Sequence, residues 1–346
     1  MTFLLSINFI ESDKFYQGEY YYLLLSSLLG ALVVSSSRDL LTIFIGIELA
    51  STPMFLLSGW KKGDRKSNEG AIKFFLLGVL SASLILYGFS LIYGLTGQLV
   101  FADISAYLLA NSLGSSPVLL LSAILVISGI GFKISVVPFH SWAPDTYEGA
   151  PLPITAYLSV SSKATGFVAL IVLLTKVFES SGQSWGVILA IVAGATMTLG
   201  NLVALQQTNP VRLLAYSSIS QAGFIIAPLA VSGITGNYQD GIFASVTYLI
   251  IYAFMNIGAF LSVHLFTNFT KSDNFYEWGG IAKHSPLTGV LTTVFFFSLA
   301  GIPPLGGWFA KFVVFRSLLS TGEIIGISLA IVCLLYTSDA ADDVRG

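Results

Sequence analysis

Four ionisable residues of this chain lie inside apolar stretches: Glu48, Lys133, Lys163 and Lys311. A charged side chain at the centre of a bilayer costs at least about 2.5–3.5 kcal/mol, so such residues usually face a partner or water and mark ion pathways. One glutamate cannot neutralise three lysines, and a buried lysine can release and regain a proton near neutral pH. Together the four residues favour a proton relay. Any one lysine alone is equally well explained by a static ion pair or by snorkelling to the membrane surface.

Prolines interrupt the apolar stretches beside three of these charges. Pro53 and Pro138 each follow a charged residue by five positions, and Pro303 and Pro304 come shortly before Lys311. A proline removes one helical hydrogen bond and clashes with the carbonyl one turn earlier. Broken helices at corresponding places in two halves of a membrane protein point to a transport site, although a single kink can also serve packing alone.

Uncharged polar residues lie in or beside the apolar stretches, between the charged positions. Individually they are more often contacts between helices than parts of a conduit. They are Asn201, Gln206, Gln207, Tyr248, Tyr252 and Asn256.

The composition predicts an integral membrane protein. Of its 346 residues, 55% are hydrophobic and 10% are charged, whereas a soluble domain carries about 25% charged residues. The apolar runs lack two-residue alternation, so helices are expected rather than strands, and about ten spans result. The runs cover residues 20–37, 40–58, 70–94, 117–137, 152–175, 184–205, 213–231, 241–267, 287–302, 305–320 and 324–335.

Cofactor and nucleic-acid binding find no support in the residue types present. Cys333 is the single cysteine, which excludes a disulfide within the chain and iron–sulfur ligation by cysteines of this chain. His140, His264 and His284 have no metal-ligand spacing. The sequence holds no Gly-rich dinucleotide fingerprint, and its net charge of -2 comes with no basic patch for nucleic acid.

Loop charges predict which ends of the helices share one side of the membrane. Basic residues crowd the 61–66 loop, and by alternation further basic loops fall on the same side, which the positive-inside rule makes cytoplasmic or matrix-like. The 138–151 loop belongs to that side but has no Lys or Arg. Lys73 and Arg316, near the ends of their stretches, are expected to snorkel. The basic-side residues are Lys14, Lys61, Lys62, Arg65, Lys66, Arg212, Lys271 and Lys283, and Arg38 lies opposite.

Both ends of the chain differ in character from the rest. Residues 1–19 are expected to be the remnant of a preceding helix and loop. Ile324–Leu335 is too short to cross a bilayer alone, and residues 336–346 are expected to be a foreign tail that is not packed.

Four stretches resemble landmarks of one family. Val137–Pro151, with the sequence VPFHSWAPDTYEGAP, resembles the signature loop of the chain N family of proton-translocating NADH–quinone oxidoreductase, or respiratory complex I. The stretches Asn201–Asn209 together with Arg212–Ser220, and Ser298–Pro304, look like other landmarks of the family. The resemblance covers roughly residues 20–335.

The resemblance implies an all-α, polytopic transmembrane bundle of two inverted five-helix repeats, each with a broken helix. These would be residues 20–178 and 184–335, the last span being incomplete. It also implies that Glu48, Lys133, Lys163 and Lys311 form the relay of an antiporter-like, proton-translocating subunit.

The same resemblance implies that this chain binds no cofactor. NADH, FMN, iron–sulfur clusters and quinone would be held by other subunits, so the enzyme activity would belong to the complex. Partners would be the other membrane-arm subunits, the lipid bilayer and protons. The expected location is a bacterial inner membrane, with an organellar energy-transducing membrane as the alternative.

Two other functions remain open. A subunit of a multisubunit cation/proton antiporter is less well matched by the Tyr147–Pro151 segment and by Asn256, where sister subunits carry lysine. A non-conducting membrane scaffold would do better with apolar residues than with unpaired buried lysines.

Overall fold

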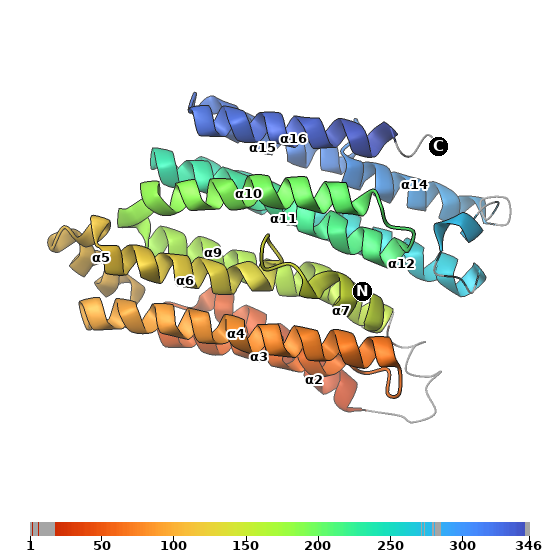
Figure 1. Ribbon diagram of the computed structural model, residues 1–346, viewed down its shortest axis with the longest axis horizontal. Coiled ribbons are helices and arrows are strands. Elements are labelled where there is room, and N and C mark those ends of the chain that lie inside the picture. Colours follow the sequence, from red (N-terminus) through yellow and green to blue (C-terminus); the bar gives the residue numbers. More distant parts are fainter. Residues whose placement is uncertain are drawn as a thin grey trace. The chain divides into compact units, whose positions relative to one another are not determined.

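The computed structural model describes residues 2, 6, 18–270, 272, 274–278, 280 and 285–342, with only the backbone given for 335–342. In these residues every regular element is a helix, and the one β-bridge is an isolated pair between Asp39 and Val100. Eight helices are long and apolar enough to cross a membrane. The prediction of an all-α, multi-pass membrane protein is therefore confirmed (Figure 1).

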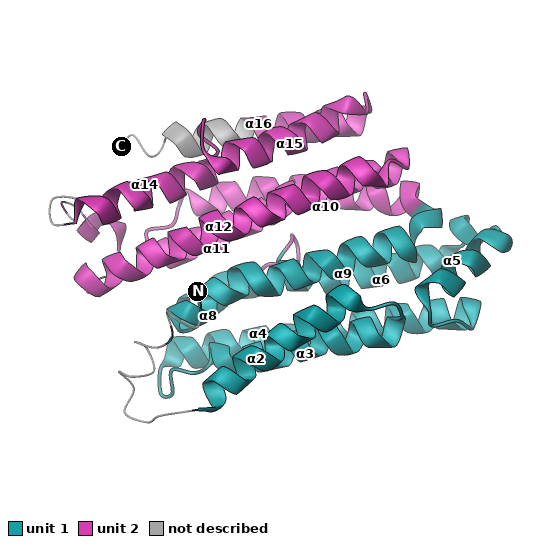
Figure 2. Ribbon diagram, turned by 180° about the vertical axis from the view of Figure 1, so that it is seen from behind, with its two compact units in different colours: residues 1–135, 141–181 teal, residues 136–140, 182–346 magenta. Residues whose placement is uncertain are grey.

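The chain forms two compact units (Figure 2). The first comprises residues 1–135 and 141–181, and the second comprises residues 136–140 and 182–346. The predicted inverted relation between two repeats stays a prediction.

In the first unit, α2 packs along α3 and α4 packs along α6. Gly30 permits the first contact, because a Cβ there would clash with the backbone of Ala50, while Ser27 Oγ donates to the Ala50 carbonyl at 2.7 Å. Asp39 and Asp64 cap the amino ends of α3 and α4. The helices are α2 (Glu19–Ser36), α3 (Leu40–Ser58), α4 (Arg65–Thr96), α5 (Phe101–Ala110), α6 (Pro117–Ile134), α7 (Trp142–Gly149), α8 (Leu152–Tyr157) and α9 (Lys163–Lys176). A π-helical turn, Leu158–Ser162, joins α8 to α9, and short 3-10 turns lie at Leu113–Ser115 and Glu179–Ser181.

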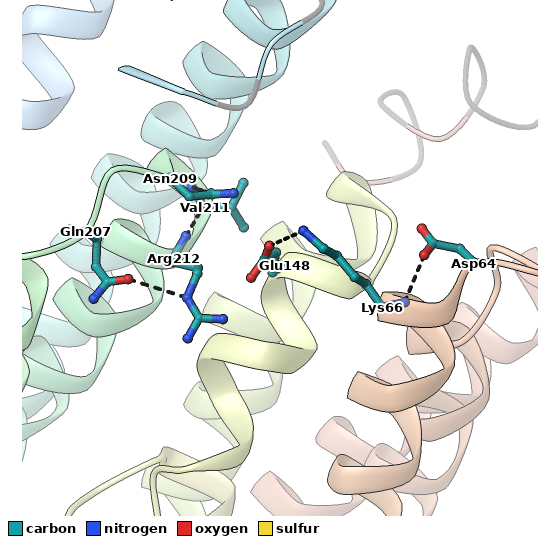
Figure 3. A network of polar contacts seen from close by, with 7 residues as sticks. All are labelled: Asp64, Lys66, Glu148, Gln207, Asn209, Val211 and Arg212. Carbon is teal, nitrogen blue, oxygen red and sulfur yellow. Dashed lines mark hydrogen bonds and ion pairs between the residues drawn. The ribbon is translucent and has the colours of Figure 1, made fainter. Parts of the chain in front are cut away.

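In the second unit, α11 is enclosed by neighbours and packs against both α10 and α12. Asn209 caps α11 by accepting hydrogen bonds from the amides of Val211 and Arg212, at 2.8 and 3.2 Å (Figure 3). The helices are α10 (Gly182–Ala204), α11 (Pro210–Thr235), α12 (Tyr238–Thr270), α14 (Pro286–Ala300), α15 (Gly306–Ser320) and α16 (Ile324–Asp342), with a 3-10 turn at Phe275–Trp278.

Each predicted apolar run corresponds to a helix or to the consecutive helices α8 and α9. The sequence did not predict α5 or α7, which are short and not continuously apolar. The helix α16 continues to Asp342, past the predicted end of its span at Leu335. Most of the predicted amino-terminal remnant and the last four residues of the predicted tail lie outside the described residues, as do Lys14, Lys271 and Lys283.

Candidate functional site

Glu48 on α3 and Lys133 on α6 are in contact. Lys133 Nζ lies 3.4 Å from Glu48 Oε1 and donates a 2.9 Å hydrogen bond to Ser51 Oγ. The lysine side chain is 5% exposed and the glutamate side chain 28%. At this separation two unit charges attract by about 5 kcal/mol at an effective dielectric constant of about 20, before desolvation is subtracted. The charged form of each residue is therefore stabilised by the charge of the other.

The helix that carries Lys133 ends one residue later. In a continuous helix the Ile134 carbonyl would accept from the amide at position 138, but Pro138 has no N–H. Trp142, at the start of α7, donates its indole N–H to the Phe132 carbonyl at 2.9 Å and stacks on Phe74 with ring centroids 4.2 Å apart. The tryptophan thereby adds a second hydrogen bond to the Phe132 carbonyl, which also accepts from the Ser135 amide at 3.1 Å, and holds α7 beside α6.

A small cavity lies next to Lys133 inside the first unit. Its volume is about 10 Å³, which is close to the room that a single water molecule needs. Its polar lining comes from Ser51, Lys133, Ser162 and Thr165, on α3, α6, the π-helical turn and α9. This cavity can hold one water between the Glu48–Lys133 pair and the helix that carries Lys163.

Lys163 is the first residue of α9, directly after the π-helical turn Leu158–Ser162. Such single turns inside helices are frequent at functional sites, because the extra residue changes the direction of the following side chains. Lys163 is 1% exposed, and its Nζ lies over the ring of Tyr147 on α7, 6.0 Å from the centroid.

Lys311 lies on α15, after the second helix break. Its side chain is buried, and Nζ donates a 2.7 Å hydrogen bond to the carbonyl of Ala300, the last residue of α14. The ring of Phe224 on α11 lies 5.0 Å from Nζ. The carboxyl end of a helix carries partial negative charge, so this position favours a cation.

The structure brings Glu48, Lys133 and Lys163 into one unit and places Lys311 in the other. Sequence reasoning missed Ser51 and Trp142 as contributors. Ser51 lies three positions after Glu48, so it shares a helix face with the glutamate and could have been found from that spacing.

Ion pairs outside the buried cluster join α4 to α7 in the first unit. Lys66 Nζ lies 2.7 Å from Glu148 (Figure 3), and Lys73 Nζ lies 2.6 Å from Asp145 and 2.7 Å from Glu69. Within the 138–151 loop, Glu148 is therefore the partner of Lys66 in the basic 61–66 segment, and Asp145 is the partner of Lys73. Lys73, which was expected to snorkel, contacts these two carboxylates, and the snorkelling stays a prediction.

The described part of the chain contains no group of three or more His, Cys, Asp or Glu side chains that could hold a metal ion. What the arrangement offers chemically is a set of buried amines and one carboxylate, and the amines of Lys133 and Lys311 donate hydrogen bonds to Ser51 Oγ and to the Ala300 carbonyl.

Residues 37–337 match the family described as NADH:quinone oxidoreductase/Mrp antiporter, TM. The chain is 42% identical over 338 residues to NADH-quinone oxidoreductase subunit N 2 of Rhizobium meliloti (strain 1021), covering 97% of this chain and 68% of the relative. It is 40% identical over 338 residues to the chloroplastic NAD(P)H-quinone oxidoreductase subunit 2 of Mesostigma viride, covering 96% and 66%. The chain thus spans about two thirds of the length of these relatives.

Solved structures share the fold. A chain of the membrane-bound sulfane sulfur reductase, an archaeal respiratory membrane complex, superposes with a TM-score of 0.86 at 25% identity, covering 98% of this chain and 68% of that one. A chain of respiratory complex I from Thermus thermophilus gives 0.76 at 31% identity, covering 98% and 72%.

Proposed function

This chain belongs to the subunit N family of NADH–quinone oxidoreductases, and we propose that it translocates protons through a relay formed by Glu48, Lys133, Lys163 and Lys311. The relay would be driven by redox chemistry that takes place in other subunits of a respiratory complex. In this proposal the chain holds no redox centre, and NADH, FMN, iron–sulfur clusters and quinone belong to its partners.

One observation carries the proposal: three lysine side chains are almost completely buried in a membrane protein, each beside an irregularity in its helix. Lys133 precedes the end of α6, Lys163 follows a π-helical turn, and Lys311 follows the interruption between α14 and α15. Burying a lysine that served only for packing would cost free energy that no other interaction of the side chain offsets. Buried amines that can release and regain a proton are the groups that a proton relay uses.

The Glu48–Lys133 pair supplies the coupling. When both groups are charged, each stabilises the other, so a change of charge or position at Glu48 alters how readily Lys133 releases its proton. A proton released by the Lys133 ammonium leaves a neutral amine, and the water-sized cavity beside Ser162 and Thr165 offers a place for the proton to pass toward Lys163. The reverse change at Glu48 lets Lys133 regain a proton.

The same proposal implies in which membrane the chain lies and which subunits surround it. The chain would lie in a bacterial inner membrane, with other membrane-arm subunits and lipid around it. The chloroplast relative keeps an organellar membrane as the alternative. A subunit of a multisubunit cation/proton antiporter remains the second candidate, because the matching family includes Mrp antiporters.

Replacing Lys163 tests the proposal. In the assembled complex, Lys163→Ala removes a buried amine. We expect proton pumping per electron to fall by at least about tenfold, because a positioned acid–base group contributes about 10²–10⁴-fold to the rate of proton transfer. Assembly of the complex should stay normal. The measurement is the pH gradient formed in membrane vesicles during NADH oxidation. Lys176→Ala is the matched control, because Lys176 lies on the same helix, is exposed and should be dispensable. Undiminished pumping per electron in Lys163→Ala would remove Lys163 from the mechanism.

A further inference from the structure

The two consecutive prolines after α14 remove two specific hydrogen-bond donors. In a continuous helix the carbonyls of Leu299 and Ala300 would accept from the amides at positions 303 and 304. Both positions are proline, which has no N–H. The carbonyls of the two preceding residues already accept hydrogen bonds. The amides of Gly301 and Ile302 both donate to Phe297 O, and the Gly301 amide also donates to Ser298 O. The carbonyls of buried Leu299 and half-buried Ala300 are therefore left for side chains to satisfy.

Each of these two carbonyls has its own side-chain partner. Gln221 on α11 donates from Nε2 to the Leu299 carbonyl at 3.1 Å, and Lys311 donates from Nζ to the Ala300 carbonyl at 2.7 Å. Gln221 is 4% exposed and Lys311 is 5% exposed. With Leu299 occupied by the glutamine, the lysine has a single defined acceptor at the end of α14.

Tyr248 on α12 fixes the direction of the glutamine amide. Its hydroxyl, which is fully buried, donates to Gln221 Oε1. Since a hydroxyl donor on the amide oxygen leaves the amide NH₂ pointing the other way, this bond directs Nε2 toward Leu299. The ring of Tyr248 also stacks on Phe224, whose ring lies beside Lys311. The hydroxyl, the amide and the helix end thus form one connected arrangement.

We propose that Gln221 and Tyr248 are positioning residues for proton transfer at Lys311. Gln221 donates to the Leu299 carbonyl at the end of α14, so that the Ala300 carbonyl is the acceptor left for the lysine. Tyr248 fixes the orientation of Gln221 by donating to its Oε1. When the Lys311 ammonium passes one proton to water or to the next acceptor, the neutral amine keeps two N–H groups. The bond to Ala300 can therefore persist in both states, and the lysine is held in one place throughout the cycle. This inference rests on the proposed relay and adds two residues to it.

The test compares Gln221→Leu, Tyr248→Phe and the double variant in the assembled complex. The measurement is proton pumping in vesicles at pH values from about 6 to about 8.5, a range that brackets the usual operating pH. Gln221→Leu should lower pumping by about tenfold, because a displacement of about 1 Å at a reacting group can cost up to about 100-fold. Tyr248→Phe keeps the ring and should lower pumping less. The double variant should be no worse than Gln221→Leu, since Tyr248 acts only through Gln221.

Ser245→Ala is the matched control, because it removes another buried hydrogen bond between α12 and α11, from Ser245 Oγ to the Ile225 carbonyl at 2.7 Å. It should pump like the unaltered complex. The pH dependence of pumping should change in Gln221→Leu, whereas a loss of folded protein would scale the whole profile equally. If Gln221→Leu does not assemble, Tyr248→Phe decides, since its fold is the less disturbed.

Two failures are distinguishable. In the first case Lys163→Ala loses pumping, but Gln221→Leu matches Ser245→Ala in rate and pH profile. The positioning role is then overturned and the relay stands. If Gln221→Leu does not assemble, Tyr248→Phe takes its place in this comparison. Equal and additive losses from the two single changes would also overturn it. If Lys163→Ala pumps normally, the relay as proposed is wrong and Lys163 leaves the mechanism, while Gln221→Leu still decides the positioning role at Lys311.

Discussion

At the scale of single residues, the Glu48–Lys133 pair gives the sharpest stability prediction. Glu48→Gln leaves the Lys133 charge buried beside Ser51 with no counter-charge, so we expect the complex to lose thermal stability. Removing one partner of a buried pair costs about 3–5 kcal/mol, and the partial exposure of Glu48 places the loss at the low end. The readout is the thermal midpoint of the purified complex.

The second variant of this pair separates charge from packing. Adding Lys133→Met to Glu48→Gln removes the unpaired charge and keeps an apolar stem of similar length. The double variant should recover most of the lost stability while remaining unable to pump. A double variant that is less stable than Glu48→Gln alone would show that the two residues stabilise the protein independently and not as a pair.

The four charged positions could be identified from the sequence, because an ionisable residue inside an apolar stretch is conspicuous there. Their uncharged partners could not. Tyr248 was expected to be a contact between helices, and Gln221 was not predicted. What makes Gln221 informative is its contact with Leu299, far along the chain, and no local pattern carries that information.

At the scale of elements, the start of α3 sets the register of the helix that carries Glu48. Asp39 accepts from the Thr42 amide at 2.8 Å and from the Thr42 hydroxyl at 2.7 Å. Burial opposes ionisation of this carboxyl, but the hydrogen bonds from Thr42 and Leu41 outweigh it and hold the pKa of Asp39 below its ordinary value of 3.8. The charged carboxylate therefore stabilises the first turn of α3.

Replacing this cap should loosen the amino end of α3 in a pH-dependent way. Asp39→Ala should lower the local free energy of opening by about 1 kcal/mol at pH 7, whereas Asp39→Asn should retain most of it. Because the pKa of the folded state is lowered, the contribution is complete above about pH 3.8 and is lost only as the pH falls through the lower folded value. Hydrogen exchange of the Thr42 and Ile43 amides measures it. Equal protection in Asp39→Ala and the unaltered protein would contradict the capping role.

The sequence predicted the long helices well and their irregularities only in part. Apolar runs mark spans because lipid demands them, and Pro138, Pro303 and Pro304 mark two interruptions because they lack N–H groups, whereas α3 continues through Pro53. The π-helical turn before Lys163 has no such marker in its Leu-Ser-Val-Ser-Ser sequence. The helix α7 was missed because eight residues rich in polar side chains do not suggest a helix until α4 supplies the partners for Asp145 and Glu148.

At the scale of the whole molecule, the division into two units bears on how the relay would work. Lys133 and Lys163 belong to the first unit and Lys311 to the second. A relay that uses all three as one path makes the units consecutive steps, whereas two independent paths would let each unit work alone. The sequence alone does not distinguish these cases, since it gives each unit its own broken helix and buried lysine.

The most direct test of the account is therefore the number of protons pumped per electron in three variants of the assembled complex: Lys163→Ala, Lys311→Ala and the two combined. Lys176→Ala and Arg316→Ala, exposed residues on α9 and α15, are the matched controls. If the buried lysines form one path, each single change lowers pumping as far as the double change does, and the controls pump normally. Pumping that persists in both single variants and disappears only in the double variant would contradict a single relay.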